Sequence, residues 1–178
     1  MPRKQLGLLI LTALSILFFA CSGSKKYAKK ADKFEESGFH KQAADYYLIS
    51  LKKKNTNIDA RIGLISNGQK VMDDYLRAFF LAHSSEDYKK SVYSFLEARS
   101  YYKEVNTTGV ELKIPDYYEG YYKTDLENYL TDRYTEGREL LNQGSFEKST
   151  VIFTEINRLN PDFKDANKLV ILSKAEPL

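Results

Sequence analysis

Few side chains of this sequence have the chemistry of a catalytic or metal site. There is one cysteine, Cys21, and there are two histidines, His40 and His83, each beside an expected turn. The sequence contains no G-x-S-x-G, no H-E-x-x-H, no glycine-rich phosphate loop and no paired C-x-x-C. Adjacent carboxylates such as Glu35 and Glu36 lie among charged helical residues, where solvation explains them. We therefore expect no catalytic residue, no bound metal and no cofactor, and a protein that is not an enzyme.

Tyrosine is the functional side chain that this sequence uses most. It has 14 tyrosines and no tryptophan, and four of the tyrosines surround Gly120 in the stretch PDYYEGYY. Adjacent residues of a helix point about 100° apart, so one tyrosine of a pair can enter the core while the other faces outward. Exposed tyrosine is favoured at interfaces because it offers a large contact area at low entropic cost. We predict that a partner binds Tyr117, Tyr118, Tyr121 and Tyr122; the alternatives are that these rings stack on a glycan or form the small core of an insertion.

The composition is that of a folded protein rather than a disordered one. The chain has 178 residues, of which 43% are hydrophobic and 29% are charged, so it is one domain or one short array of repeats. The formal net charge of +3 includes Arg3 and Lys4. A chain cut after the apolar run that follows them would carry only about +1. This charge is too small to indicate nucleic acid as a partner.

The first 20 residues have the three parts of a secretory signal peptide. Arg3 and Lys4 precede an apolar run over residues 6–19, and the small residue Ala20 follows it. The run is shorter than the roughly 20 apolar residues of a spanning helix. The stretch FFAC resembles the bacterial lipobox, which implies that Cys21 is lipidated, with a palmitate-type acyl chain among its lipids, and that residues 21–26 are a tether. The alternative is that Cys21 is a free thiol after an ordinary signal peptide.

The residues after Cys21 bear on the location of the protein. In lipoproteins of enteric bacteria an Asp after the cysteine retains the protein in the inner membrane, whereas this chain has Ser22. The sequence is similar in this respect to outer-membrane lipoproteins, which implies a lipid anchor in the outer membrane. We expect the domain on the periplasmic side; the alternative is the cell surface. Five lysines follow, and they either rest on anionic headgroups or form a solvated helix face. They are Lys25, Lys26, Lys29, Lys30 and Lys33.

The remainder of the chain has the pattern of helices, and three stretches of it resemble one another. Apolar residues recur three or four apart, and no alternating strand pattern competes. Each similar stretch has a turn residue, a small residue five positions later, an aromatic residue nine positions later and a further small or branched residue at twelve. The aligned sets are Gly38, Glu86 and Gly144; Ala43, Ser91 and Ser149; Tyr47, Phe95 and Phe153; and Ser50, Ala98 and Ile156.

This constellation resembles the second half of a tetratricopeptide (TPR) repeat, in which two antiparallel helices cross closely. The turn residue adopts a left-handed conformation, the small residue lets the backbones approach, and the aromatic ring fills the groove between helices. The resemblance implies an all-α fold, a TPR-like helical-hairpin solenoid; the alternative is an amphipathic bundle with another connectivity. The small-residue column lies at 43, 91 and 149, which is wider than the roughly 34 residues of a regular array. We therefore expect irregular insertions.

The expected order of domains follows from these boundaries. We expect one long helix from Asp59 toward His83, although Gly63 and Gly68 leave room for a break. Gly109 and Pro115 interrupt the helical pattern within residues 105–122, and this stretch predicts a loop. The segments are a signal peptide (1–20), a tether (21–26), a first TPR-like unit (27–57), a long helix with a second unit (58–105), a tyrosine-rich insertion or loop (106–122), a third unit (123–161) and a C-terminal helix (162–178).

The resemblance also implies a function. TPR domains bind peptides or other proteins and catalyse nothing themselves. In this chain Asp32, Tyr134 and Arg138 occupy positions expected in the groove, and they do not reproduce the clamp by which some TPR families hold a C-terminal carboxylate. We therefore expect a protein-binding scaffold whose partner offers a surface or an internal segment, in an envelope assembly, type IX secretion or motility complex. The alternative is a lipoprotein that binds a glycan or small ligand through the Tyr117–Tyr122 cluster.

Overall fold

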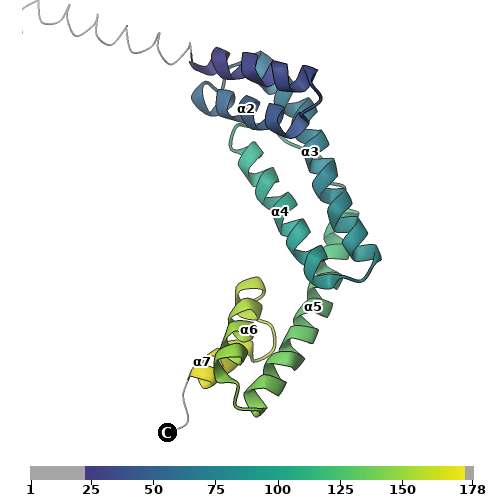
Figure 1. Ribbon diagram of the computed structural model, residues 1–178, viewed down its shortest axis with the longest axis vertical. Helices are drawn as coiled ribbons and strands as arrows, with labels where there is room; N and C mark the ends of the chain where they lie inside the picture. The colour runs from purple at the N-terminus through teal and green to yellow at the C-terminus, as the bar shows by residue number, and fades with distance from the viewer. Residues whose placement is uncertain (1–22, 175–178) are drawn as a thin grey trace, which may run out of the picture. The chain divides into compact units, whose positions relative to one another are not determined.

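The computed structural model describes residues 23–174 and is all-α over that range (Figure 1). This confirms the expected all-α class. The expected signal peptide and Cys21 lie outside the described residues. Within this range no helix has both the length and the apolar character needed to cross a membrane. The helices are residues 23–36, α2 (His40–Lys53), α3 (Ile58–Ser84), α4 (Tyr88–Asn106), α5 (Tyr117–Asn142), α6 (Phe146–Leu159) and α7 (Ala166–Lys174).

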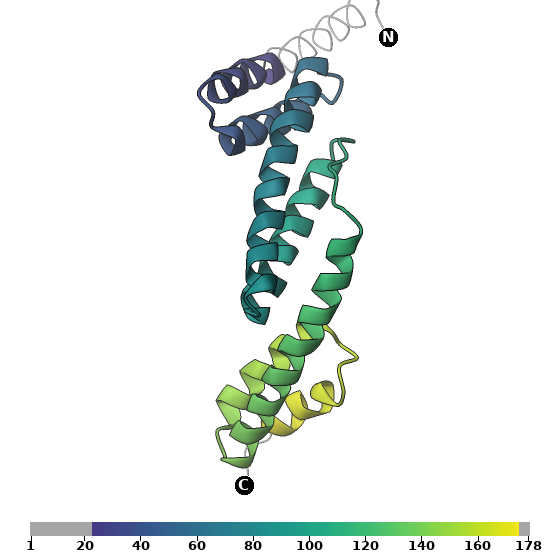
Figure 2. The same cartoon turned by 90° about the vertical axis from the view of Figure 1, so that its right-hand side faces the viewer.

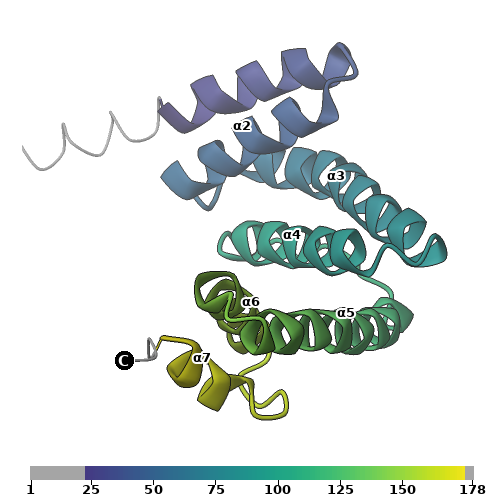
Figure 3. The ribbon, with the colours of Figure 1, turned by 60° about the horizontal axis from the view of Figure 1, so that its bottom comes forward.

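The described residues form two compact units, and α3 and α4 contribute to both. The first unit contains the residues up to Ala78 together with Ser94–Pro115, and the second contains Phe79–Tyr93 and the residues from Asp116 onward. In the second unit α5 packs against α6, and α6 packs against α7 (Figure 2). In the first unit the helix of residues 23–36 lies alongside α2 (Figure 3).

Three helix ends share one backbone conformation. Gly38, Glu86 and Gly144 have positive φ angles of 77°, 56° and 73°. The residue after each donates its N–H to the carbonyl five residues earlier, and the turn residue donates to the carbonyl three residues earlier, which is the Schellman pattern. Glu86 therefore adopts the conformation of the two glycines although its side chain disfavours it. The hydrogen bonds that span five residues join the N–H of Phe39 to the carbonyl of Phe34 (2.8 Å), Asp87 to Ala82 (3.0 Å) and Ser145 to Leu140 (2.8 Å).

The aligned residues after these turns are buried. The small residues Ala43, Ser91 and Ser149 and the further residues Ser50, Ala98 and Ile156 are all fully buried, and the aromatic set Tyr47, Phe95 and Phe153 is 3% exposed at most. Two of the rings lie directly on the backbone of a neighbouring helix. A Cβ atom added to Gly63 would lie 2.6 Å from Cε1 of Tyr47 and nearer still to Cζ, and one added to Gly137 would lie 3.0 Å from Cε1 of Phe153. Glycine at these sites allows the helices to approach.

Gly63 and Gly68 do not break α3, which runs continuously from Ile58 to Ser84. The packing of Tyr47 explains the presence of Gly63. The long helix is therefore one element, and both units use it.

When the sequence is aligned at Gly38 and Gly144, a polar site in the interior of the first unit matches an apolar site in the interior of the second. In the first unit Ser24 and Ser50 are fully buried and their hydroxyl oxygens lie 2.9 Å apart, while Asn57 donates to Ser24 over 3.0 Å. The equivalent residues of the second unit are Leu130, Ile156 and Phe163, which are 5% exposed at most. At these aligned positions the first unit is thus held by hydrogen bonds and the second by apolar contacts.

The expected loop over residues 106–122 is wrong in extent. Asn106 is the last residue of α4, the connection covers residues 107–116, and α5 begins at Tyr117. The connection is held on α3 by Gln69, whose Oε1 accepts from the Lys113 N–H over 2.7 Å and whose Nε2 donates to the Lys113 carbonyl over 3.1 Å. Val110 and Leu112 are buried beside it. The four tyrosines are therefore helical, because the connection ends before them.

Candidate functional site

The four tyrosines at the start of α5 divide into buried and exposed rings. Tyr117 is 56% exposed and Tyr121 is 38% exposed, whereas Tyr122 is only 5% exposed. Tyr118 is half-buried and stacks on Tyr117, with 4.6 Å between ring centroids. Tyr122 therefore belongs to the core, and only two of the four predicted partner-binding tyrosines, Tyr117 and Tyr121, are exposed.

The end of α3 adds three rings that belong to the same cluster. Phe79 lies 5.7 Å from Tyr118 between centroids and is fully buried. His83 stacks on Tyr121 at 4.6 Å, and Phe80 lies 6.4 Å from Tyr121 and is 44% exposed. We call Phe80, His83, Tyr117 and Tyr121 the aromatic surface. Every residue of it belongs to the second unit.

Phe80 and His83 are not among the partner-binding residues predicted from the sequence. A signal for them exists, because residues three or four apart on a helix share one face. Phe79 and Phe80 precede His83 by four and three residues, so the three rings are predicted to share one side of the helix. The tyrosine stretch itself is far from them in the sequence, so only the fold joins the two.

A buried carboxylate fixes the position of the His83 ring. Asp125 is 1% exposed, and within residues 23–174 it is the only buried charged side chain. Nδ1 of His83 lies 3.0 Å from Oδ1 and 2.9 Å from Oδ2 of Asp125, and the Ser91 hydroxyl donates to Oδ2. A buried carboxylate needs such donors because it has lost its water. The sequence analysis missed Asp125, which looks like an ordinary surface residue in a charged helix.

The group formed by Asp125, His83 and Ser91 does not have the order of a catalytic triad. In a triad the histidine lies between the carboxylate and the nucleophile, so that it can accept the proton of the nucleophile. Here the carboxylate lies between the other two, and Ser91 is fully buried. The network therefore orients His83 and gives the aromatic surface a rigid support.

A second carboxylate network lies elsewhere in the same unit. The Tyr129 hydroxyl donates to Oε1 of Glu155 over 2.8 Å, Tyr93 donates to the same oxygen, and Nε of Arg133 donates to Oε2 over 3.2 Å. Burial by itself would raise the pKa of Glu155. The tyrosine hydrogen bonds and the charge of Arg133 outweigh it, so the pKa of Glu155 is lower than its ordinary value.

The three residues expected in the groove have contacts within the chain. The Tyr47 hydroxyl lies 2.7 Å from Oδ1 of Asp32, and the Tyr134 hydroxyl donates to Asp165. Arg138 is exposed. Asp32 and Tyr134 therefore join a helix to another element of its own unit. Asp32 is exposed as well, and Tyr134 is half-buried. None of the three belongs to the aromatic surface.

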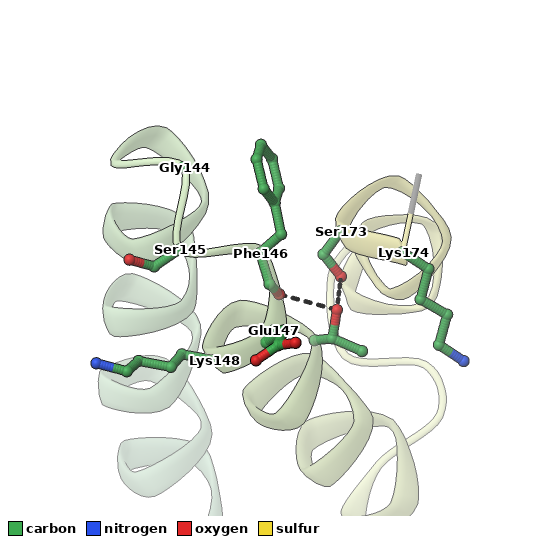
Figure 4. Close-up of a pocket in the computed structure, with 8 residues that line it drawn as sticks. Gly144, Ser145, Phe146, Glu147, Lys148, Ser173 and Lys174 are labelled. Carbon is green, nitrogen blue, oxygen red and sulfur yellow. Dashed lines mark hydrogen bonds between the residues drawn. The ribbon is translucent and has the colours of Figure 1, made fainter. Parts of the chain in front are cut away.

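A cavity of about 610 Å³ lies between the turn before α6 and the end of α7 (Figure 4). The hydroxyl of Thr150 donates to that of Ser173 over 2.8 Å, so these two polar groups satisfy each other. The remaining lining residues are exposed or half-buried and carry one carboxylate and two ammonium groups. The lining residues are Gly144, Ser145, Phe146, Glu147, Lys148, Thr150, Ser173 and Lys174. In the part of the chain that the structure describes, no group of three His, Cys, Asp or Glu residues has the arrangement of a metal site.

Comparison of the chain with protein families, curated proteins and solved structures gave no match.

Proposed function

We propose that this protein is a lipid-anchored, non-catalytic scaffold of the bacterial outer membrane that binds another protein. The observation that carries the proposal is the aromatic surface. The large side chains of Phe80, Tyr117 and Tyr121 lie in one cluster, and each exposes between 38% and 56% of its area. Clustered exposed rings of this kind are typical of protein interfaces.

The support beneath this surface favours binding with little rearrangement. His83 is held by Asp125, and Tyr118 packs on buried Phe79. Both contacts restrict the rings before a partner arrives, which lowers the entropic cost of association. Tyrosine adds a hydroxyl group at the edge of each exposed ring, so a partner can offer both apolar and polar contacts.

The repeated turns support the proposal that the chain is a TPR-like solenoid. Gly38, Glu86 and Gly144 have the same backbone conformation, and the aligned small and aromatic residues after them are buried. Helical-hairpin repeats of this type act as scaffolds because neighbouring repeats build an extended surface. The lipid anchor rests on Cys21 and the apolar run before it.

Photo-crosslinking in the cells that produce the protein tests the proposal. A photoreactive p-benzoylphenylalanine replaces Tyr117 in the full chain, and in a matched control it replaces Phe39. The two sites are equally exposed, at 56% and 54%, but Phe39 belongs to the first unit. We expect one defined envelope protein to be crosslinked from Tyr117 and not from Phe39, and the yield to fall in a Cys21→Ser background.

Equal crosslinking from both sites would contradict a specific surface. Crosslinking of polysaccharide instead of protein would favour a glycan receptor. The structure offers such a ligand less free surface, because Tyr117 already stacks on Tyr118 and Tyr121 on His83, so one face of each exposed ring is covered.

A further inference from the structure

One face of the helix of residues 23–36 carries five lysines and, in its last turn, Glu36. Its five lysines are all exposed, and at about 100° per residue they fall within an arc of about 140°. The opposite side of the helix carries Ser24, Ala28 and Ala31, which are buried. We call Lys25, Lys26, Lys29, Lys30 and Lys33 the lysine face.

Among the described residues, no carboxylate forms a salt bridge with the lysine face. The same helix carries three acidic residues. Asp32 and Glu35 lie 2.7 and 2.6 Å from the Tyr47 hydroxyl, and the exposed Glu36, in the last turn, has no ammonium group of the lysine face at salt-bridge distance within the described residues. Lys30 lies 4.4 Å from the centroid of the Tyr46 ring, a contact that orients the ammonium group and leaves its charge in place.

Repulsion between the neighbouring lysines of this face destabilises the helix. Lysines four residues apart lie next to one another on a helix, and like charges at that spacing repel. Lys25 and Lys29, Lys26 and Lys30, and Lys29 and Lys33 have this spacing. An anionic surface in contact with the lysine face would remove the repulsion and convert it into attraction.

The position of the face in the chain identifies that surface. Lys25 follows Cys21 by four residues, and an apolar run precedes Cys21 directly. A chain held at Cys21 by lipid keeps these lysines within a few residues of the headgroups, where the local concentration of phosphate is high.

We propose that the lysine face rests on anionic phospholipid headgroups of the membrane that holds Cys21, and so fixes how the first unit is oriented on that membrane. This inference rests on the lipid anchor of the proposed function. The ligand chemistry is the phosphate group, and its source is the lipid bilayer. Each lysine near an anionic surface favours the bound state about fivefold, so five of them outweigh the free rotation of a tethered unit.

Chemical labelling of lysines tests the orientation. The full lipidated protein is reconstituted in vesicles of phosphatidylcholine alone or mixed with phosphatidylglycerol, and the rate of acetylation is measured for each lysine by mass spectrometry. We expect the lysine face to react about fivefold more slowly in the anionic vesicles at about 0.1 M salt, and the protection to disappear at about 1 M salt. The exposed Lys89 and Lys148 are internal controls.

A charge variant separates this face from the net charge of the protein. A fluorophore on Ser37→Cys, which lies close to the lysine face, should shift to the blue in anionic vesicles only. Replacement of the five lysines by Gln should abolish the shift. Replacement of Lys89, Lys90, Lys103, Lys123 and Lys148 by Gln removes the same charge from exposed sites elsewhere and should preserve it.

Three results would overturn the inference. Equal labelling in neutral and anionic vesicles would show a solvated face, with the anchor itself intact. Equal protection by inorganic phosphate in neutral vesicles would show a site for a soluble anion. Intact mass spectrometry reports the anchor separately, so a mature chain without lipid mass would refute the anchor of the proposed function and the inference with it.

Discussion

The substitution Gly63→Ala tests the packing of Tyr47 on α3 most directly. Alanine normally stabilises a helix interior by about 1 kcal/mol relative to glycine. Here the added Cβ would lie 2.6 Å from Cε1 of Tyr47 and closer to two further ring atoms. The ring cannot move aside at low cost, because Tyr47 is 3% exposed and its hydroxyl is bonded to Asp32 and Glu35.

The expected cost combines these effects. Overpacking of a core costs about 1–3 kcal/mol, and a strained hydrogen bond to a carboxylate adds about 1.5–3 kcal/mol. After subtraction of the gain in helix propensity, Gly63→Ala should lower the free energy of unfolding by about 1.5–5 kcal/mol. Urea unfolding followed by circular dichroism at the helix band measures it.

Gly120 provides the matched control. It is also helical, but a Cβ added there meets no atom within 4 Å, so Gly120→Ala should raise stability by about 0.5–1 kcal/mol. A second check is Tyr47→Leu, which should make Gly63→Ala less costly because the ring is gone. If Gly63→Ala is as stable as Gly120→Ala, the ring does not lie on the α3 backbone and the reasoning is refuted.

Three further outcomes are expected. Glu86→Gly should raise the free energy of unfolding by about 0.5–1 kcal/mol, because glycine removes the strain of the positive φ angle, and unchanged or lower stability in urea would contradict the left-handed turn. Asp125→Ala should lower the free energy of unfolding by about 2–3 kcal/mol, because it removes the acceptor shared by His83 and Ser91. It should also broaden the nuclear magnetic resonance signals of the His83 ring, and a sharp, unshifted signal would contradict the network. The pKa of Glu155 in the folded protein is below its ordinary value of 4.5, so ionised Glu155 stabilises the fold above pH 4.5 and this stability is lost as the pH falls below it. The pH dependence of Tm below about 4.5 should therefore be flatter in Glu155→Gln. An unchanged slope would show that Glu155 does not contribute to it.

The local parts of the fold could be predicted well from the sequence. The turn residues, the small residues and the aromatic residues were aligned correctly, including the pairing of Glu86 with two glycines. These features depend on contacts within a few residues of the turn, and their chemistry is therefore visible in a short stretch. The site could be predicted only in part. Tyr117 and Tyr121 are exposed as expected, but Tyr122 is buried.

The errors share a physical cause. The loop expected up to residue 122 ends at 116, because burial of Val110 and Leu112 and the bonds to Gln69 hold the connection on α3. Nothing in the local pattern near Pro115 reveals a contact with a residue so distant in the chain. Phe80 was missed for the same reason, since it meets Tyr121 only after the helices have packed.

The sequence by itself determined that the chain is helical, where the three aligned turns lie, and that five lysines share a face. Helix periodicity and turn conformation are properties of neighbouring residues, so they can be inferred from their order. Only the tertiary structure decided which tyrosines are exposed, that Asp125 is buried beneath His83, and that Asp32 and Glu35 bond to Tyr47 instead of to the lysine face. Burial and pairing depend on what packs against each residue from elsewhere in the chain, and helix periodicity alone does not specify those neighbours.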